Sequence, residues 1–275
     1  MTYIISEIGI NHNGDINLAK ELILKSKTSG CDAVKFQKRD IESVYTKEEL
    51  DTPRESPFGT TTREQKDGIE FSIEQYKELE KFSKEQGLDF IVSCWDKVSL
   101  DLVEEHLDVK YHKVASALAT DKTFLQKLND TKKPIILSVG MCTQEEVEAA
   151  VDILDNVEYI LACTSTYPTK AEELNLKYIQ TLKETYPNIK IGFSNHYNGM
   201  DACVGSIAFG AECIEFHITK DRTMYGSDQP ASIQDSDDLV HAIKMMELMI
   251  GDGVKKVYDS EIPIAEKLRK VNDII

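Results

Sequence analysis

The chain has 275 residues and a formal net charge of −16. Such an acidic protein repels nucleic acid and anionic lipid, so neither is expected as a partner, although lysines clustered inside a pocket could still attract a small anion. The length suits one α/β barrel of about 250 residues.

Neither a membrane segment nor a secretion signal is expected. No apolar run reaches the length of about 18 residues that a spanning helix requires. The start, MTYIISEIGINHNG, has no basic region and no cleavage site of small residues. The six cysteines show no CxxC spacing. The sequence therefore predicts a cytoplasmic protein with buried, reduced thiols.

Strand-like apolar runs alternate with amphipathic helical stretches eight times along the chain. The predicted pairs of strand and helix are 3–10 and 15–29, 32–37 and 73–86, 88–94 and 97–106, 110–116 and 121–130, 133–140 and 143–154, 157–164 and 173–185, 189–195 and 200–209, and 212–219 and 236–250. This repetition predicts a single-domain (β/α)8 TIM barrel over residues 1–252. An open doubly wound sheet is the alternative, but GINHNGD after the first strand is not the glycine-rich turn GxGxxG.

Two stretches fall outside this alternation. Residues 38–70 are rich in charge, Thr, Pro and Gly, and they are predicted to form a lid or a solvated insertion. Residues 253–275 follow the eighth helix as a tail that is expected to end in one short helix.

The chemistry of such a barrel lies at the carboxyl ends of its strands. In CIEFHITKD (213–221), apolar residues alternate with Glu215, His217 and Thr219, so one face of the strand is apolar and the other is polar. We expect the polar face to look into the barrel mouth. Other polar residues expected at strand ends are Glu7, Asn11, His12, Lys35, Gln37, Lys113, Ser116, Ser138, Tyr167, Ser194 and His196.

Two pairs of side chains carry specific hypotheses. His196 and His217 lie at the ends of neighbouring predicted strands, at positions whose side chains point into the barrel. This placement favours a pair of metal ligands over two packing histidines. Lys35 and Lys113 are costly to bury in strands, which favours anion binding over ion-paired core lysines. Serines at strand ends can then donate to an anion that the lysines hold.

Eight motifs occur in order: EIGINHNGD, AVKFQ, KVAS, PIILSVGM, CTSTYPT, FSNH, IEFHITKD and GSDQPAS. Over residues 3–255 this set resembles the catalytic barrel of the sialic acid (N-acetylneuraminate) synthase family. Members join phosphoenolpyruvate to an N-acetylated amino sugar, release phosphate and need a divalent metal, Mn²⁺ or Mg²⁺. The resemblance implies a transferase with two small-molecule substrates, phosphoenolpyruvate and an aldose, and it allows a homodimer.

The resemblance also implies roles for residues at matching positions. His196 and His217 resemble the metal ligands, while Tyr167 and Asp228 match residues that approach the acceptor. The residues that match the phosphoenolpyruvate site are Lys35, Gln37, Lys113, Ser116, Ser138 and Ser194.

Departures from the family pattern concentrate on the acceptor side. After KVAS the family usually reads Gly-Glu, whereas this chain has Ala117 and Leu118, so an apolar side chain replaces a carboxylate. The family's Gly-Pro-Asp-His reads GSDQ at 226–229. The family's C-terminal antifreeze-like domain is expected to be missing. We therefore expect an acceptor other than N-acetylmannosamine, with Leu118 at the wall of its pocket.

The favoured hypothesis is a metal-dependent synthase that forms a 2-keto-3-deoxy acid, with Glu7, Glu215 and Lys113 in catalytic roles. One alternative is a barrel aldolase or lyase that uses Lys113 as a Schiff-base nucleophile and needs no metal. The other is a non-catalytic anion-binding barrel, because Leu118 and the missing domain both suggest lost activity.

Overall fold

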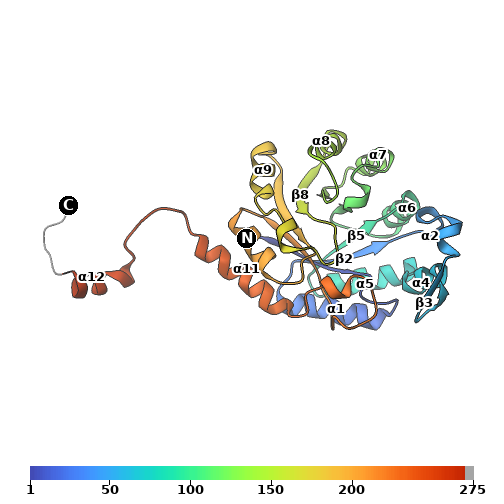
Figure 1. Cartoon of the computed structure of the whole chain (residues 1–275), viewed down its shortest axis with the longest axis horizontal. Coiled ribbons are helices and arrows are strands. Elements are labelled where there is room, and N and C mark those ends of the chain that lie inside the picture. Colours follow the sequence, from blue (N-terminus) through green and yellow to red (C-terminus); the bar gives the residue numbers. More distant parts are fainter. Residues whose placement is uncertain (270–275) are drawn as a thin grey trace.

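The computed structural model describes residues 1–269 and contains a closed parallel barrel (Figure 1). Its strands join in the order β1-β10-β9-β8-β7-β6-β5-β2. They are β1 (Tyr3–Gly9), β2 (Ala33–Lys38), β5 (Asp89–Cys94), β6 (His112–Val114), β7 (Ile135–Ser138), β8 (Val157–Cys163), β9 (Lys190–Asn195) and β10 (Cys213–His217). The predicted (β/α)8 barrel is confirmed, and the open-sheet alternative is wrong.

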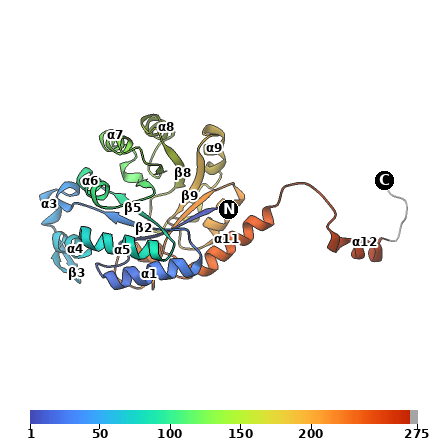
Figure 2. The ribbon, with the colours of Figure 1, turned by 180° about the vertical axis from the view of Figure 1, so that it is seen from behind.

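A helix follows each barrel strand and covers the outside of the barrel (Figures 1 and 2). These helices are α1 (Ile16–Ser29), α5 (Ile73–Glu85), α6 (Lys97–His106), α7 (Lys122–Asp130), α8 (Gln144–Ile153), α9 (Tyr178–Thr185), α10 (Asp201–Ala208) and α11 (Ser236–Ile250). Local sequence sets their bounds. In α1, the Asp15 side chain accepts from first-turn N–H groups, and Gly30 ends the helix in the left-handed conformation with φ 87°.

Helix α9 begins five residues later than the hydrophobic pattern predicts. A short 3-10 turn, η2 (Ala171–Glu173), comes first, and Asn175 then adopts a φ of 44°. A left-handed residue cannot continue a right-handed helix, and Asn is among the residues that tolerate this conformation best. The pattern of apolar residues does not report this break.

Residues 41–70, which follow β2 and are called the excursion below, are folded and packed. The excursion contains α2 (Ile41–Val44), α3 (Lys47–Leu50), the hairpin of β3 (Pro53–Ser56) and β4 (Gly59–Thr61), and α4 (Thr62–Ile69). A Cβ at Gly14 would lie 2.0 Å from the Gly68 carbonyl oxygen, so the backbones are in contact there. The rings of Phe58 and Tyr225 meet edge to face at 6.3 Å. The excursion therefore rests on the loops that follow β1 and β10.

The barrel interior is filled at its amino-terminal end. The rings of Tyr3, Tyr111 and Tyr159 lie 5.7–6.2 Å apart there. A layer of buried residues, which includes Ile5 and Leu161, packs with them. Since this end is packed, a ligand must enter from the carboxyl end of the strands.

After α11 the chain leaves the barrel and ends in α12 (Ile262–Leu268), as both views show (Figures 1 and 2). The end of the predicted tail, residues 270–275, lies outside the described residues. Over residues 1–269, no helix is both long enough and apolar enough to cross a membrane. All six cysteines are free, and four of them are buried.

Candidate active site

A cavity of about 190 Å³ lies at the carboxyl ends of the barrel strands. Of the residues predicted to act in catalysis or to bind substrate or metal, all line it except Asp228 and Leu118, and the strand-end residues Asn11, His12 and Thr219 do not line it either. Those lining it are Glu7, Lys35, Gln37, Lys113, Ser116, Ser138, Tyr167, Ser194, His196, Glu215 and His217. The alternation of strand residues thus brings predicted side chains from six strands to one place.

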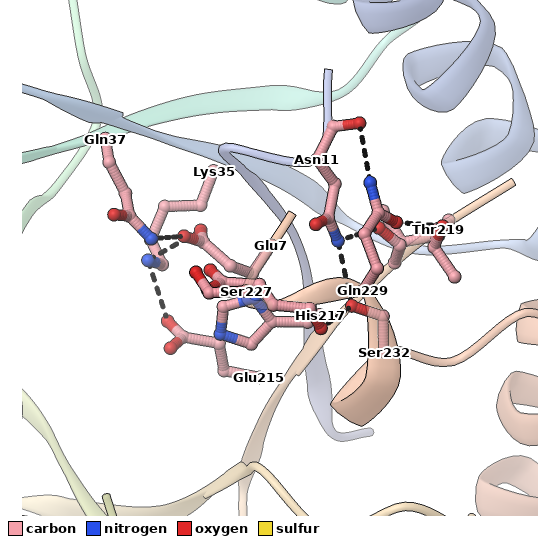
Figure 3. A network of polar contacts seen from close by, with 12 residues as sticks. Glu7, Asn11, Lys35, Gln37, Glu215, His217, Thr219, Ser227, Gln229 and Ser232 are labelled. Atoms are coloured by element: carbon pink, nitrogen blue, oxygen red, sulfur yellow. Dashed lines mark hydrogen bonds and ion pairs between the residues drawn. The ribbon is translucent and has the colours of Figure 1, made fainter. Parts of the chain in front are cut away.

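Two lysines, Lys35 and Lys113, and two glutamates, Glu7 and Glu215, form the floor of this cavity. Figure 3 shows Lys35 between the two glutamates. Lys35 Nζ lies 2.6 Å from Glu7 Oε2 and 3.8 Å from Glu215 Oε2, and Lys113 Nζ lies 3.4 Å from Glu215 Oε1. None of the four side chains is more than 4 % exposed. Two positive and two negative groups cancel, so the floor is neutral before a ligand arrives.

Burial and pairing act in opposite directions on these groups. Burial would raise the pKa of Glu215, but Lys113 and Lys35 lower it to about 2, so this carboxylate is ionised at neutral pH. Burial lowers the pKa of Lys113 more than its pairing with Glu215 raises it. Burial also opposes the charge on Lys35, yet Glu215 and Glu7 together raise the pKa of that lysine. Lys113 is therefore the more readily deprotonated of the two lysines.

Several buried polar atoms of the floor have no hydrogen-bond partner among residues 1–269. They are Glu7 Oε2, Glu215 Oε2 and Ser138 Oγ. Buried polar atoms are normally hydrogen-bonded, so an unpartnered group in a cavity wall calls for a missing partner. Glu7 Oε2 is already ion-paired with Lys35 at 2.6 Å, so Glu215 Oε2 and Ser138 Oγ are the atoms positioned to meet a bound water or substrate.

The rings of His196 and His217 lie side by side, with centroids 5.3 Å apart. His196 Nδ1 is 2.9 Å from the Thr164 carbonyl oxygen. A carbonyl only accepts, so Nδ1 carries the proton and Nε2 keeps a free lone pair. His217 Nδ1 is 3.5 Å from Asp228 Oδ2, and burial lowers the pKa of His217, which keeps the ring neutral. Burial opposes the charge on His196, but Cys163 and the Thr164 carbonyl together raise the pKa of this ring. An imidazole binds a metal in its neutral form, so a metal at His196 would displace a proton.

The two imidazoles fit a divalent cation that draws its other ligands from water or substrate. In the part of the chain that the structure describes, no group of three or more His, Cys, Asp or Glu side chains could hold an ion. Magnesium prefers oxygen ligands, so of the two expected ions manganese suits a pair of nitrogen donors better.

Asp228 approaches the site from a loop, where its Oδ2 lies 3.5 Å from His217 Nδ1. The buried amides of Asn11 and Gln229 hold this loop in place (Figure 3). Gln229 is fully buried, accepts a hydrogen bond from Thr219 Oγ1 and donates to the Asn11 carbonyl oxygen at 3.2 Å. This links the loop to the segment that follows β1 and leaves Asp228 facing His217. Gln229, where this chain departs from the family motif, is therefore a structural residue that supports the loop.

Leu118 lies outside the cavity. It lines a separate cavity of about 440 Å³ that shares only Trp95 with the first, and it packs against the main core. The exposed Ala117 lines the active-site cavity instead. Both residues lie in the 3-10 turn η1 (Ser116–Leu118), whose successive side chains point in different directions. The apolar wall that we expected at Leu118 is formed by Ala117.

This placement gives a prediction for two neighbouring substitutions. Leu118→Glu should destabilise the protein by about 1–3 kcal/mol, because it puts a carboxylate against the core. Ala117→Glu should change stability by less than about 0.5 kcal/mol but should alter kcat/KM for aldehyde acceptors by about tenfold or more. Urea unfolding and steady-state assays of both variants measure these effects. The reverse pattern, with Leu118→Glu affecting only acceptor kinetics, would contradict the placement.

The lining residues that the sequence prediction missed include Trp95, Met141 and Cys163. Trp95 directly follows β5, so its place in the chain was a usable signal. Cys163 lies two residues after the buried Leu161 in β8, so its side chain points to the same inward face of the strand. The sequence gives no comparable indication for Met141, because its backbone φ of 63° depends on the tertiary structure.

His12 was expected at the site, but it lies beside it. Its ring stacks on Phe71 with centroids 4.0 Å apart, and its Nδ1 accepts a hydrogen bond from the Gly14 N–H at 3.0 Å. Burial lowers the pKa of His12 to about 3. This histidine is therefore a neutral packing residue at neutral pH.

The buried His12 should make the fold sensitive to acid. The unfolded chain binds a proton at this residue below about pH 6.5, whereas the folded protein binds it only near pH 3, so stability falls as the pH falls between these values. Between pH 7.5 and 5 the expected loss from His12 is about 2 kcal/mol. Urea unfolding of the wild type and of His12→Phe at both pH values measures this term. Equal pH dependence in the two proteins would rule it out.

Comparison with known proteins gives matches over nearly the whole chain. The NeuB family model matches residues 22–255. N-acetylneuraminate-9-phosphate synthase of Mus musculus is 35% identical over 275 residues, which are 98% of this chain and 76% of that protein. N,N'-diacetyllegionaminic acid synthase of Legionella pneumophila is 34% identical over 281 residues, covering 98% of this chain and 78% of that protein. The structure of N-acetylneuraminic acid (sialic acid) synthetase from Leptospira borgpetersenii, in complex with citrate, superposes with a TM-score of 0.84 at 29% identity, covering 98% of this chain and 93% of that one.

Proposed function

Because the chain belongs to the NeuB family, we propose that it condenses phosphoenolpyruvate with an aldehyde sugar to give a 2-keto-3-deoxy acid and phosphate. The family and the class of enzyme expected from the ordered motifs are confirmed by these matches. The observation that carries the proposal is one cavity in which Lys35 and Lys113 face His196 and His217.

The lysines hold the donor in this proposal. Phosphoenolpyruvate brings a carboxylate and a phosphate, and the ammonium groups of Lys35 and Lys113 attract them into the cavity. Ser138 has an unpartnered hydroxyl in the wall that can donate to the same anion. Since Glu7 and Glu215 already balance the lysines, the donor's charge needs a further cation nearby.

His196 and His217 would hold that cation, Mn²⁺ in preference to Mg²⁺. When bound, a divalent cation polarises the aldehyde carbonyl as a Lewis acid. Tyr167 lies against this part of the cavity, with its ring 4.1 Å from that of His196, and it would position the acceptor.

The reaction then forms one carbon–carbon bond and one carbon–oxygen bond to water, and it breaks the carbon–oxygen bond to phosphate, which leaves with the second proton of that water. Carbon 3 of the donor attacks the aldehyde carbon, and the aldehyde oxygen takes a proton, for which we assign Lys113 because of its lowered pKa. Water adds to carbon 2, and one of its protons passes to a carboxylate oxygen of Glu7 or Glu215. The tetrahedral adduct loses phosphate and leaves the keto group.

The acceptor is expected to differ from N-acetylmannosamine. The two relatives named above make different sugar acids, so they leave the acceptor open. The outer wall of the cavity includes Trp95, Ala117, Met141 and Tyr167. This apolar wall favours an acceptor that is less polar, near its reacting carbon, than N-acetylmannosamine.

Phosphate release from phosphoenolpyruvate tests the proposal. We expect phosphate release only when the wild type has both Mn²⁺ and a suitable aldose, drawn from N-acetylmannosamine, other aldoses and their phosphates. Metal removal by a chelator should abolish turnover. A borohydride-trappable adduct at Lys113 without a metal requirement would favour the aldolase alternative. Donor binding with no turnover across the whole panel would favour the non-catalytic barrel.

A further inference from the structure

Arg39, which directly follows β2, is a buried cation just outside the active-site cavity. Its side chain is only 11 % exposed. Its guanidinium carbon lies 4.0 Å from the ring centroid of Trp95, and its Nη2 donates to Gln37 Oε1 at 2.6 Å. Both partners line the cavity, while Arg39 itself does not. Arg39 therefore contacts two walls of the site from behind.

The contact with Gln37 determines which way that amide points. Arginine only donates, so the atom facing Arg39 must be the amide oxygen. The amide nitrogen then turns the other way and donates to Glu7 Oε1 at 2.6 Å (Figure 3). Glu7 in turn pairs with Lys35 through its other oxygen. A continuous series of contacts thus runs from Arg39 to the ionic floor.

The contact with Trp95 holds the adjacent part of the wall, at the end of the neighbouring strand β5. The planar guanidinium lies over the indole ring within the range of a cation–π contact. Trp95 separates the active-site cavity from the neighbouring cavity that Leu118 lines. If this ring moved, both cavities would change shape. The flat, stacked guanidinium is a contact that a lysine at this position could not reproduce.

The excursion after β2 anchors Arg39. Glu70, which follows α4, has Oε1 4.0 Å from Arg39 Nη1. Its Oε2 accepts from Lys38 Nζ at 3.1 Å and from the Arg39 backbone N–H at 3.3 Å. The excursion therefore folds back to the strand that it left and supplies the carboxylate beside two buried cations.

We propose that Arg39 is a positioning residue for the reaction, and that the excursion 41–70 serves to hold it. By fixing the Gln37 amide and the Trp95 ring, Arg39 sets the shape of the cavity without touching substrate. The kinetic consequence rests on the proposed function, whereas the effect on Trp95 does not.

Steady-state kinetics test whether Arg39 acts through the Gln37 amide. We expect Arg39→Met to lower kcat/KM for phosphoenolpyruvate about tenfold or more, as loss of one charge-assisted hydrogen bond does, and to affect the same kinetic parameters as Gln37→Ala. Added to Gln37→Ala, it should lower kcat/KM by no more than about threefold further, since both changes remove one contact. Arg54→Met, at an exposed arginine in β3, is the matched control and should behave as the wild type. Wild-type kinetics in Arg39→Met, or losses that multiply in the double variant, would overturn the proposal.

Fluorescence tests whether Arg39 fixes the Trp95 ring, and it requires no turnover. Trp95 is the only tryptophan in the chain, so the signal reports this ring alone. In folded Arg39→Met, acrylamide should quench Trp95 about twice as strongly as in the wild type, and anisotropy decay should show a more mobile ring. Arg39→Lys should resemble Arg39→Met, and it takes its place if the methionine variant does not fold. Arg54→Met should match the wild type. Unchanged quenching and anisotropy in the folded Arg39 variants would overturn the proposal even if the wild type proves inactive on every aldose.

Discussion

Replacing Lys113 or Lys35 with methionine should weaken phosphoenolpyruvate binding by about ten- to a hundredfold. Each substitution removes one charge-assisted contact of about 1.5–3 kcal/mol with the donor. Methionine keeps most of the buried volume, so the effect reports the lost charge rather than a cavity. Titration calorimetry with phosphoenolpyruvate measures the change in dissociation constant.

The same two substitutions should differ in their effect on stability. Lys35→Met leaves Glu7, which is fully buried, without its ion-pair partner at 2.6 Å. Lys113→Met leaves Glu215 with Lys35 and with the Ser194 hydroxyl, which donates to it at 3.0 Å. Breaking a buried pair costs about 3–5 kcal/mol when one charge is left alone, so Lys35→Met should approach this range and Lys113→Met should fall below it.

Lys110→Met is a matched control for the two lysine variants. Lys110 pairs with Asp89 and lies over Tyr3 at the packed end of the barrel, far along the strands from the cavity. It is half-exposed, so its loss should cost at most about 1 kcal/mol and leave donor binding unchanged. Donor dissociation constants that stay at the wild-type value in well-folded Lys35→Met and Lys113→Met would remove the lysines from the donor site.

His196→Ala and His217→Ala should each weaken Mn²⁺ binding by about a hundredfold or more. Loss of a residue that merely orients a metal ligand lowers affinity about ten- to a hundredfold, and loss of a ligand itself should do at least as much. Asp228→Asn should fall in the lower range, because Asp228 faces His217 at 3.5 Å and orients it. Metal content and Mn²⁺ titration followed by electron paramagnetic resonance give the affinities directly.

His241→Ala serves as the control for the histidine variants, since His241 is exposed on α11. It should bind Mn²⁺ as the wild type does. If His196→Ala and His217→Ala also retain wild-type metal content and affinity, the two histidines are not the ligands, and the imidazole pair must be explained as packing beside Tyr167.

The sequence by itself determined the barrel and the inward face of most strands. The alternation in 213–219 places Glu215 and His217 on one side of a strand whatever surrounds it, because successive side chains of a strand point to opposite faces. Helix starts such as Asp15 before α1 are equally local. These features depend on residues a few positions apart, so a single sequence can report them.

Only the tertiary structure decided how the inward residues pair and which of the others reach the site. Glu7 meets Lys35, and Glu215 meets both lysines, across strands that are distant in the sequence. Arg39 reaches Trp95 only because β2 and β5 are neighbours in the barrel. Strand parity says nothing about the short turn η1, where Ala117 faces the cavity and Leu118 faces the core. Such contacts depend on distances between segments brought together by folding, and local periodicity carries no information about those distances.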